Sequence, residues 1–319
     1  GGHLIANETD SFALLQQEWA SPLCGEVGTT PLGHFARVHL RGLAEQGLSP
    51  KTLHRIFMRA AATADPQSAA FRSALDCFAS LAETGVFPFS AGAARDTLAA
   101  YRAAGCPAVR HSECYRAAYH PAYRVVGAPD AAVLPLLCAI DALLAARPRV
   151  LISIDGGAAS GKSTLGAYLA ALYDANLYHM DDFFLRAAQR TPARLAEIGG
   201  NLDRERFAAE VLTPLTTGAP VSYRRFTCAD FTLSAPVTAL PKRLEIIEGA
   251  YANHPAFGTP YDLRVFLTIA PATQRARILQ RNGTAMLRRF TETWIPMENA
   301  YFAMTKLADT ADILLCLAD

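Results

Sequence analysis

The second half of the chain alternates between two hydrophobic periods. Short apolar runs are typical of strands buried in a parallel sheet, and they occur at residues 150–154, 175–180, 244–247, 263–269 and 313–316. Apolar residues at three- and four-residue intervals predict helices between these runs, at residues 165–172, 204–212, 271–281 and 288–308. Strands that alternate with helices predict a parallel sheet covered on both faces, with its site at the carboxyl ends of the strands.

Residues 1–147 follow a helical period instead. Residues of the kind that begin helices are Ser49-Pro50, Asp65-Pro66 and Ser90, and those that end helices are Gly85 and Gly105. Alanine-rich segments with apolar residues three or four positions apart lie between these signals. We therefore expect an all-α N-terminal domain at residues 1–147, a boundary at Arg147-Pro148 and an α/β domain at residues 148–319.

The composition narrows the class of protein. The chain has 319 residues, of which 51% are hydrophobic. Its net charge is only +1 and it contains no basic run, so the composition does not favour nucleic acid or an anionic membrane as the partner. Seven scattered cysteines without a CxxC pair suit reduced cytosolic thiols better than disulfides or a zinc site. The longest apolar stretch, residues 131–146, is too short to span a bilayer. We expect a cytoplasmic protein whose partner is a small molecule, and leave a homo-oligomer open.

One motif joins the first of these strands to the helix after it. Residues 156–163 have the G-x-x-x-x-G-K-S pattern of a phosphate-binding P-loop. In such a loop the backbone N–H groups and the helix N-terminus face the phosphates, the lysine reaches the β- and γ-phosphates, and the serine hydroxyl binds Mg²⁺. The residues expected to bind ATP are Gly156, Gly157, Ala158, Ala159, Ser160, Gly161, Lys162, Ser163 and Thr164. A glycine-rich turn before an ordinary helix is the alternative, which the strand, the spacing and the Lys-Ser pair disfavour.

Further motifs follow the P-loop. They are Met180-Asp181-Asp182-Phe183-Phe184, Asn201-Leu202-Asp203, Ile247-Glu248-Gly249, the segment from Tyr261 to Leu267, and Arg281-Asn282-Gly283. In this order and spacing, residues 148–319 resemble the uridine kinase and phosphoribulokinase-like family. The resemblance implies a P-loop NTPase fold and a Mg²⁺-dependent enzyme that transfers the γ-phosphate of ATP to the hydroxyl of a small molecule.

The resemblance assigns roles to two acidic positions. Asp181 matches the carboxylate that these kinases use as catalytic base toward the acceptor, and a carboxylate at a strand end can orient a hydroxyl for in-line attack. The alternative for Asp181 is to cap the next helix, although Asp182 suits that role better. Glu248 ends an apolar strand where such kinases place an acid that holds Mg²⁺, here together with Ser163. Its alternative is an acid that faces solvent.

Asp203 and three arginines complete the resemblance. Asp203 matches an acid that binds sugar hydroxyls in uridine kinases, and capping of the helix that begins at Arg204 is an equal alternative. Arg277 and Arg281 match the lid arginines that close over the phosphates and stabilise the transferred charge. Arg275 is a third, less favoured candidate for the same role. The alternative for all three arginines is a solvated helix face.

The chain departs from the family where the acceptor should be recognised. Uridine kinases carry a Tyr-x-Phe-x-x-His type of segment that reads the base, whereas this chain has Tyr223-Arg224-Arg225-Phe226-Thr227-Cys228, without a histidine. If Tyr223, Arg224 and Arg225 line the acceptor pocket, the two guanidinium groups favour a carboxylate or a phosphate. The acceptor is therefore either a nucleoside, as the resemblance implies, or an acidic or phosphorylated metabolite, as the two arginines favour. A non-catalytic module that senses ATP is a third alternative, but such a module needs no base like Asp181.

The segment at residues 111–124 is rich in tyrosine, histidine and arginine. Tyr115 and Tyr119 should share one face of a helix that His120-Pro121 ends. We favour the interpretation that these tyrosines pack between the two domains. The alternative is an aromatic and basic surface that reaches the active site.

Overall fold

The structure is a computed structural model that describes residues 8–20, 26–63, 68–107, 109 and 111–317, in two compact units, Gly1–Leu134 and Pro135–Asp319. The division precedes the expected boundary at Arg147-Pro148 by the length of helix α7 (Leu134–Ala146). Side chains of the second unit hold this helix, because the Tyr173 hydroxyl lies 3.4 Å from the carbonyl oxygen of Leu137 and Arg243 donates to that of Leu144 at 2.5 Å.

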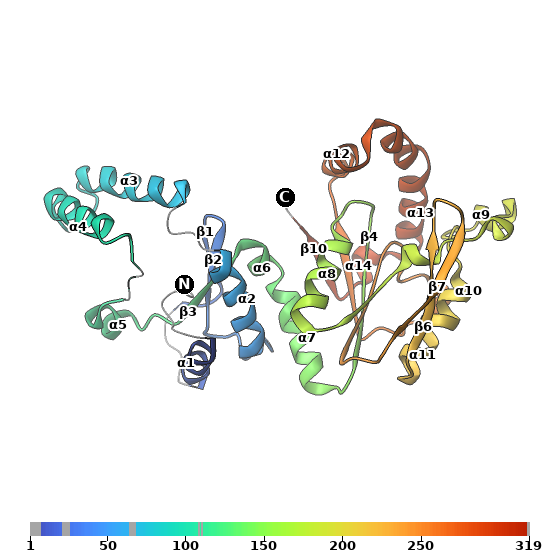
Figure 1. Cartoon of the computed structure of the whole chain (residues 1–319), viewed down its shortest axis with the longest axis horizontal. Helices are drawn as coiled ribbons and strands as arrows, with labels where there is room; N and C mark the ends of the chain where they lie inside the picture. Colours follow the sequence, from blue (N-terminus) through green and yellow to red (C-terminus); the bar gives the residue numbers. More distant parts are fainter. Residues whose placement is uncertain (1–7, 21–25, 64–67, 108, 110, 318–319) are drawn as a thin grey trace. The chain divides into compact units, whose positions relative to one another are not determined.

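The first unit is largely helical, as the sequence predicts (Figure 1). Its helices are α1 (Glu8–Ala20), α2 (Pro50–Thr63), α3 (Ala69–Glu83), α4 (Ala91–Ala103), α5 (Glu113–Tyr119) and α6 (Ala128–Ala132). It also contains an antiparallel sheet in the order β1-β2-β3, formed by β1 (Thr29–Leu32), β2 (Phe35–His39) and β3 (Tyr123–Gly127). The prediction of an all-α domain is therefore incomplete. The sheet was not predicted because strands of four or five residues are too short to show a clear alternating pattern.

Helix boundaries in this unit follow the predicted signals. The Ser49 and Ser90 hydroxyls each accept a hydrogen bond from an amide three residues further on, at the starts of α2 and α4. Gly85 and Gly105 follow the ends of α3 and α4. The third start signal, Asp65-Pro66, lies outside the described residues.

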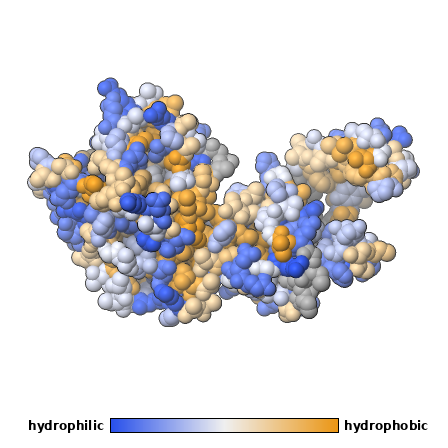
Figure 2. Space-filling model, turned by 180° about the vertical axis from the view of Figure 1, so that it is seen from behind, coloured by the Kyte–Doolittle hydropathy of each residue, from blue (hydrophilic) through white to orange (hydrophobic). Residues whose placement is uncertain are grey.

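Residues 111–124 form α5 and the start of β3. The rings of Tyr115 and Tyr119 lie 4.7 Å apart, and α5 ends at His120, as predicted. His111 stacks on Tyr115 with ring centroids 4.6 Å apart. Both tyrosines are exposed, so within this unit they form an aromatic surface. A second apolar surface lies on the α3–α4 hairpin, where Figure 2 shows hydrophobic atoms; its exposed residues are Leu81, Val86 and Phe89.

The second unit is built on a five-stranded parallel sheet in the order β10-β9-β4-β8-β5. The strands are β4 (Val150–Gly156), β5 (Asn176–His179), β8 (Leu244–Glu248), β9 (Leu263–Thr268) and β10 (Ile313–Cys316). Each apolar run that predicts a strand forms one. The predicted parallel α/β fold is confirmed.

The connections carry the remaining elements of this unit. Its other α-helices are α8 (Lys162–Tyr173), α9 (Pro192–Ala196), α10 (Arg204–Phe207), α11 (Thr213–Thr217), α12 (Pro271–Arg289), α13 (Ile295–Thr305) and α14 (Leu307–Thr310). Short 3₁₀ helices are η2 (Met180–Phe183), η3 (Ala187–Gln189) and η5 (Pro255–Phe257), and π-helical turns are η4 (Ala208–Leu212) and η6 (Phe290–Trp294). Strands β6 (Val221–Thr227) and β7 (Thr232–Ala239) form an antiparallel hairpin that the sequence analysis did not predict.

Helices cover both faces of the sheet. Helix α8 packs against β4, β5 and β8 on one face. On the other face, Leu151, Ile247 and Phe266 share a buried cluster with Phe207 of α10 and Tyr301 of α13. Across the described ranges, no helix is both long and apolar enough to cross a membrane.

Candidate active site

The P-loop joins the carboxyl end of β4 to the start of α8, as predicted. Gly156 has a left-handed φ of 148°, and a Cβ there would collide with the carbonyl oxygen of Leu267, so only glycine fits this position. The Lys162 ammonium donates to the carbonyl oxygen of Gly157 at 2.9 Å and so folds back over the loop. The first turn of α8 exposes Ser163 and Thr164 at a helix N-terminus, which favours an anionic ligand.

A buried carboxylate fixes the residue before the loop. Asp155 accepts hydrogen bonds from the Gly156 amide at 2.7 Å, the Asn253 amide at 3.0 Å and the Tyr301 hydroxyl at 2.7 Å. Burial raises the pKa of Asp155, while these hydrogen bonds and the Lys162 charge lower it. Asp155 was not predicted from the sequence, although an acid inside an apolar strand is a usable signal, because buried acids need partners.

Glu248 is buried at the end of β8, beside the P-loop helix. Its Oε1 lies 2.5 Å from Nδ1 of His179, the last residue of β5, and this bond is the main reason why the pKa of His179 is raised. A Cβ at Gly166 would lie 3.4 Å from the Cγ of Glu248. Since Gly166 follows Ser163 by about one helical turn, the two predicted Mg²⁺ ligands come from neighbouring parts of β8 and α8.

These positions suit a phosphate-bound Mg²⁺ ion better than a protein cage. Among the described residues, no group of three or more His, Cys, Asp and Glu side chains is arranged to hold a metal. Mg²⁺ bound with a nucleotide needs only one or two protein carboxylates, since phosphate oxygens and water complete its shell. Ser163 and the His179-bound Glu248 fit that pattern.

Asp181 and Asp182 follow β5 in helix η2 and have different surroundings. Within the described part of the chain, the exposed Asp181 carboxylate makes no hydrogen bond or ion pair. Although the Asp181 residue is exposed, the protein that surrounds it displaces part of its water; this desolvation and the Glu248 charge raise the pKa of Asp181, while Lys162 lowers it. The Asp182 carboxylate is more shielded and lies 3.7 Å from Arg225. Neither residue caps a helix, because η2 begins before both and has no side-chain cap.

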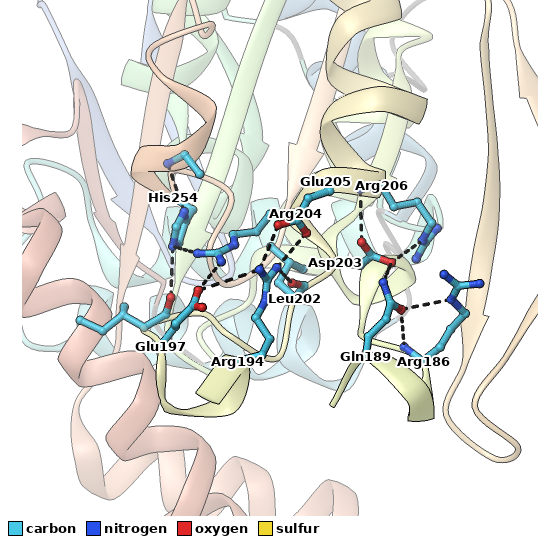
Figure 3. A network of polar contacts seen from close by, with 12 residues as sticks. Arg186, Gln189, Arg194, Glu197, Leu202, Asp203, Arg204, Glu205, Arg206 and His254 are labelled. Atoms are coloured by element: carbon cyan, nitrogen blue, oxygen red, sulfur yellow. Dashed lines mark hydrogen bonds and ion pairs between the residues drawn. The ribbon is translucent and has the colours of Figure 1, made fainter. Parts of the chain in front are cut away.

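Asp203 is buried in a polar network across residues 186–206 (Figure 3). One of its oxygens accepts from the Arg206 amide at 3.2 Å as the N-cap of α10. The other accepts from Gln189 at 3.0 Å and from the Arg206 guanidinium at 3.4 Å. Of the two roles predicted for Asp203, the structure shows the helix cap. Its contact with sugar hydroxyls stays a prediction, and it requires this network to open.

Arg206, which the sequence analysis missed, connects this network to the site. Its guanidinium donates to the carbonyl oxygens of Asp182 and Arg224 at 2.7 Å each. It also lies over the Phe183 ring, 4.3 Å from the centroid. Arg206 therefore ties α10 to the segment that carries Asp181 and to hairpin β6–β7.

The structure of the β6–β7 hairpin argues against one predicted acceptor contact, that of Tyr223. Tyr223 is buried and stacks on Phe183, with ring centroids 5.6 Å apart, so it belongs to the hydrophobic core. A register shift between Arg224 and Phe226 breaks the strand alternation and leaves both arginines exposed. The Arg225 guanidinium lies beside the Asp182 carboxylate.

The three arginines of α12 differ in what they touch. Arg277 donates to the carbonyl oxygens of Ala159 at 3.2 Å and Leu317 at 3.3 Å, so it lies against the P-loop. Arg281 is exposed and donates to its neighbour Asn282, and Arg275 is exposed. The structure therefore brings Arg277 to the site and leaves Arg281 and Arg275 on the helix surface.

Helices α12 and α13 place two more side chains on the P-loop that the sequence analysis missed. Glu298 accepts from the Ala158 amide at 2.8 Å, and Gln274 donates to the Ala158 carbonyl oxygen at 3.0 Å. Burial raises the pKa of Glu298 to about 7, although Lys162 and the Ala158 amide lower it. This buried carboxyl group therefore becomes a negative group beside the expected phosphate site only as the pH rises through about 7.

This carboxylate predicts a pH dependence of stability. Because the folded-state pKa of about 7 lies above the ordinary 4.5, the folded chain binds the proton of Glu298 more tightly than the unfolded chain does. Its contribution to stability therefore falls by about 3 kcal/mol as the pH rises through this interval. Glutamine does not ionise, so the Glu298→Gln variant does not lose this stability. The difference between its Tm and that of the wild type should therefore become more positive from about pH 5 to about pH 8. Thermal unfolding at both pH values tests this, and an unchanged difference would contradict it.

Comparison with known proteins finds matches among solved structures alone. No family model and no curated protein matches the chain. It is similar to a protein provisionally assigned as a uridine kinase from Bacillus stearothermophilus, with 20% identity and a TM-score of 0.42 over 56% of this chain and 98% of that one. A fructose transport system kinase, also provisionally assigned, from Silicibacter sp. has 26% identity and a TM-score of 0.44 over 52% and 89%. Shikimate kinase from Acinetobacter baumannii has 19% identity and a TM-score of 0.32 over 55% and 87%.

Proposed function

We propose that the second unit is an ATP-dependent kinase that transfers the γ-phosphate to the hydroxyl of a small molecule. The observation that carries this proposal is the position of Asp181, two residues after His179, which ends β5 and pairs with Glu248 at the end of β8. The charges of Lys162 and Glu248 act on the pKa of Asp181 at this position. A module that only senses ATP needs the P-loop alone, whereas a kinase also needs a carboxylate for the acceptor. The described cysteines are free, which supports a cytosolic enzyme.

In this mechanism, Asp181 accepts the proton of the acceptor hydroxyl as its oxygen attacks the γ-phosphorus. The bond from that phosphorus to the bridging oxygen breaks, and ADP leaves with the electron pair. A raised pKa makes Asp181 a stronger base than an ordinary aspartate. Lys162 and Arg277 stabilise the charge on the transferred group. A Mg²⁺ ion held by Ser163 and Glu248 would neutralise the phosphates.

The acceptor is a nucleoside or an acidic or phosphorylated metabolite, and one observation favours the second class. The Arg225 side chain is 56% exposed and lies 3.7 Å from the carboxylate of Asp182, the neighbour of the proposed base. A guanidinium in this place can bind a carboxylate or phosphate of the acceptor through two hydrogen bonds. It offers no comparable advantage to a neutral nucleoside.

Replacing Arg225 by alanine should raise the KM for the acceptor about tenfold, the usual effect of a lost hydrogen bond to a charged group. The KM for ATP should stay unchanged, since Arg225 belongs to the hairpin and not to the P-loop. Arg224→Ala is the comparison and should have the smaller effect, because Arg224 reaches Glu210 and Arg206 through its backbone. Rapid turnover of uridine or cytidine, with both arginines dispensable, would restore the nucleoside assignment.

The function is tested by ADP release from MgATP against a panel of nucleosides, sugars, sugar phosphates and hydroxy acids. One class should raise ADP release far above the rate without acceptor. If the protein binds ATP tightly and no acceptor raises the rate, the nucleotide-sensing module replaces the kinase. If it binds no nucleotide, both proposals fail.

A further inference from the structure

Both backbone polar groups of one P-loop residue are held by side chains from the C-terminal helices. The Ala158 amide donates to Oε2 of Glu298 at 2.8 Å, and its carbonyl oxygen accepts from Nε2 of Gln274 at 3.0 Å. Glu298 and Gln274 are each 8% exposed, so water competes little for these bonds. The next carbonyl oxygen, that of Ala159, accepts from Arg277 at 3.2 Å.

These side chains come from the two ends of one excursion of the chain, residues 271–305, which we name the α12–α13 arm (Figure 1). Gln274 and Arg277 lie in the first two turns of α12, where the arm begins. The chain kinks at Gly283, passes the π-helical turn η6 and returns in α13, whose first turn contains Glu298. Both stems of the arm therefore contact the dipeptide Ala158–Ala159.

We propose that Glu298 and Gln274 are positioning residues that hold the Ala158 peptide, and with it the P-loop, in the form that binds the phosphates of ATP. The inference rests on the proposed nucleotide binding by this loop. Because the Ala158 amide donates to Glu298, the N–H groups left for the phosphates are those of the other loop residues. These groups must point in one direction. Ala159 has a left-handed φ of 59°, which is unfavourable for alanine. Hydrogen bonds on both sides of the preceding residue offset that cost and keep the loop in one form.

The test combines nucleotide affinity with hydrogen exchange on the full chain. Glu298→Ala removes the acceptor of the Ala158 amide, so binding of MgATP, measured by calorimetry, should weaken about tenfold or more. Exchange of the peptide that covers residues 156–161 should become faster in the same variant. Once the acceptor is known, its KM should change less than about twofold, because the hydrogen bonds of Glu298 and Gln274 described above go to the P-loop and not to η2, which carries Asp181, or to β6, which carries Arg225.

Three further variants separate positioning from general destabilisation. Glu298→Gln keeps an oxygen that can accept from Ala158, so it should bind MgATP within about threefold of wild type. Gln274→Ala removes the other bond and should weaken binding in the same direction, even if Glu298→Ala does not fold. Glu292→Ala is the matched control, since this exposed acid of the arm pairs with Arg288 on the surface.

The outcomes decide between this inference and the proposed function. Weaker binding and faster exchange in Glu298→Ala, rescued in Glu298→Gln, support the positioning role even if no acceptor is ever phosphorylated. Wild-type affinity in both Glu298→Ala and Gln274→Ala overturns that role and leaves the kinase proposal standing. Equal losses in the alanine and glutamine variants of Glu298 overturn the hydrogen bond as the cause. Absence of nucleotide binding in the wild type overturns both.

Discussion

Replacing Lys162 by alanine is expected to reduce phosphotransfer to a small residual rate while the fold is retained. In the structure the half-buried Lys162 ammonium donates to the carbonyl oxygen of Gly157, a contact that the loop can lose without losing its core. Its proposed partners are the β- and γ-phosphates, where a fixed cation in a site shielded from water lowers the barrier to transfer. Loss of such a group reduces turnover by about 100- to 1,000-fold. Turnover and circular dichroism on the same sample test this prediction.

Lys242→Ala is the matched control for this experiment. Lys242 pairs with Asp174 at 2.6 Å, and both side chains lie at the surface beyond the P-loop helix. Its removal should leave turnover near the wild-type value. If Lys162→Ala also retained that value, the P-loop would have no part in the reaction, and the proposed mechanism would be wrong.

The P-loop and the five parallel strands could be predicted because their signals are local. Each strand is a short apolar run, and the G-x-x-x-x-G-K-S spacing lies between the first strand and its helix. Asp181 and Glu248 could be placed near each other because they follow parallel strands, whose carboxyl ends share one edge. The order of the elements along the chain is enough to place these two acids together, without any knowledge of distant contacts.

The acceptor side could not be predicted in the same way, because its decisive features depend on tertiary structure. A register shift in β6 turns Arg224 and Arg225 outward together, and strict alternation would have separated them. Tyr223 is buried because Phe183 and Tyr178 lie beside it in the fold. Neither the register shift nor the burial of Tyr223 leaves a pattern in the neighbouring sequence.

The contacts of Glu298 and Gln274 with the P-loop could not be predicted for a similar reason. Glu298 and Gln274 reach Ala158 across 140 and 116 residues of chain. In the sequence, both residues resemble ordinary polar positions of amphipathic helices. A buried acid is recognised only when burial is known, so the role of Glu298 follows from the structure alone.

Asp181→Asn is expected to reduce kcat by about 100-fold or more, the usual effect of a lost general base, with the affinity for ATP little changed. Asparagine has the shape of aspartate but cannot take the proton of the acceptor hydroxyl. The fold should not suffer, because the exposed Asp181 carboxylate makes no hydrogen bond or ion pair in the described part of the chain. Removal of its charge also relieves the repulsion by Glu248 that raises the pKa of Asp181. Turnover at saturating substrates and calorimetry with ATP measure the two quantities.

Asp182→Asn distinguishes the two neighbouring acids. The Asp182 carboxylate lies 3.7 Å from Arg225 and is more shielded than that of Asp181, so its loss should act through Arg225. We therefore expect Asp182→Asn to change mainly the KM for the acceptor and to retain most of kcat. If Asp182→Asn lowers kcat more than Asp181→Asn does, the base is Asp182. In that case the pair with Arg225 must open when the acceptor binds, and the guanidinium becomes a gate to the base instead of an acceptor contact.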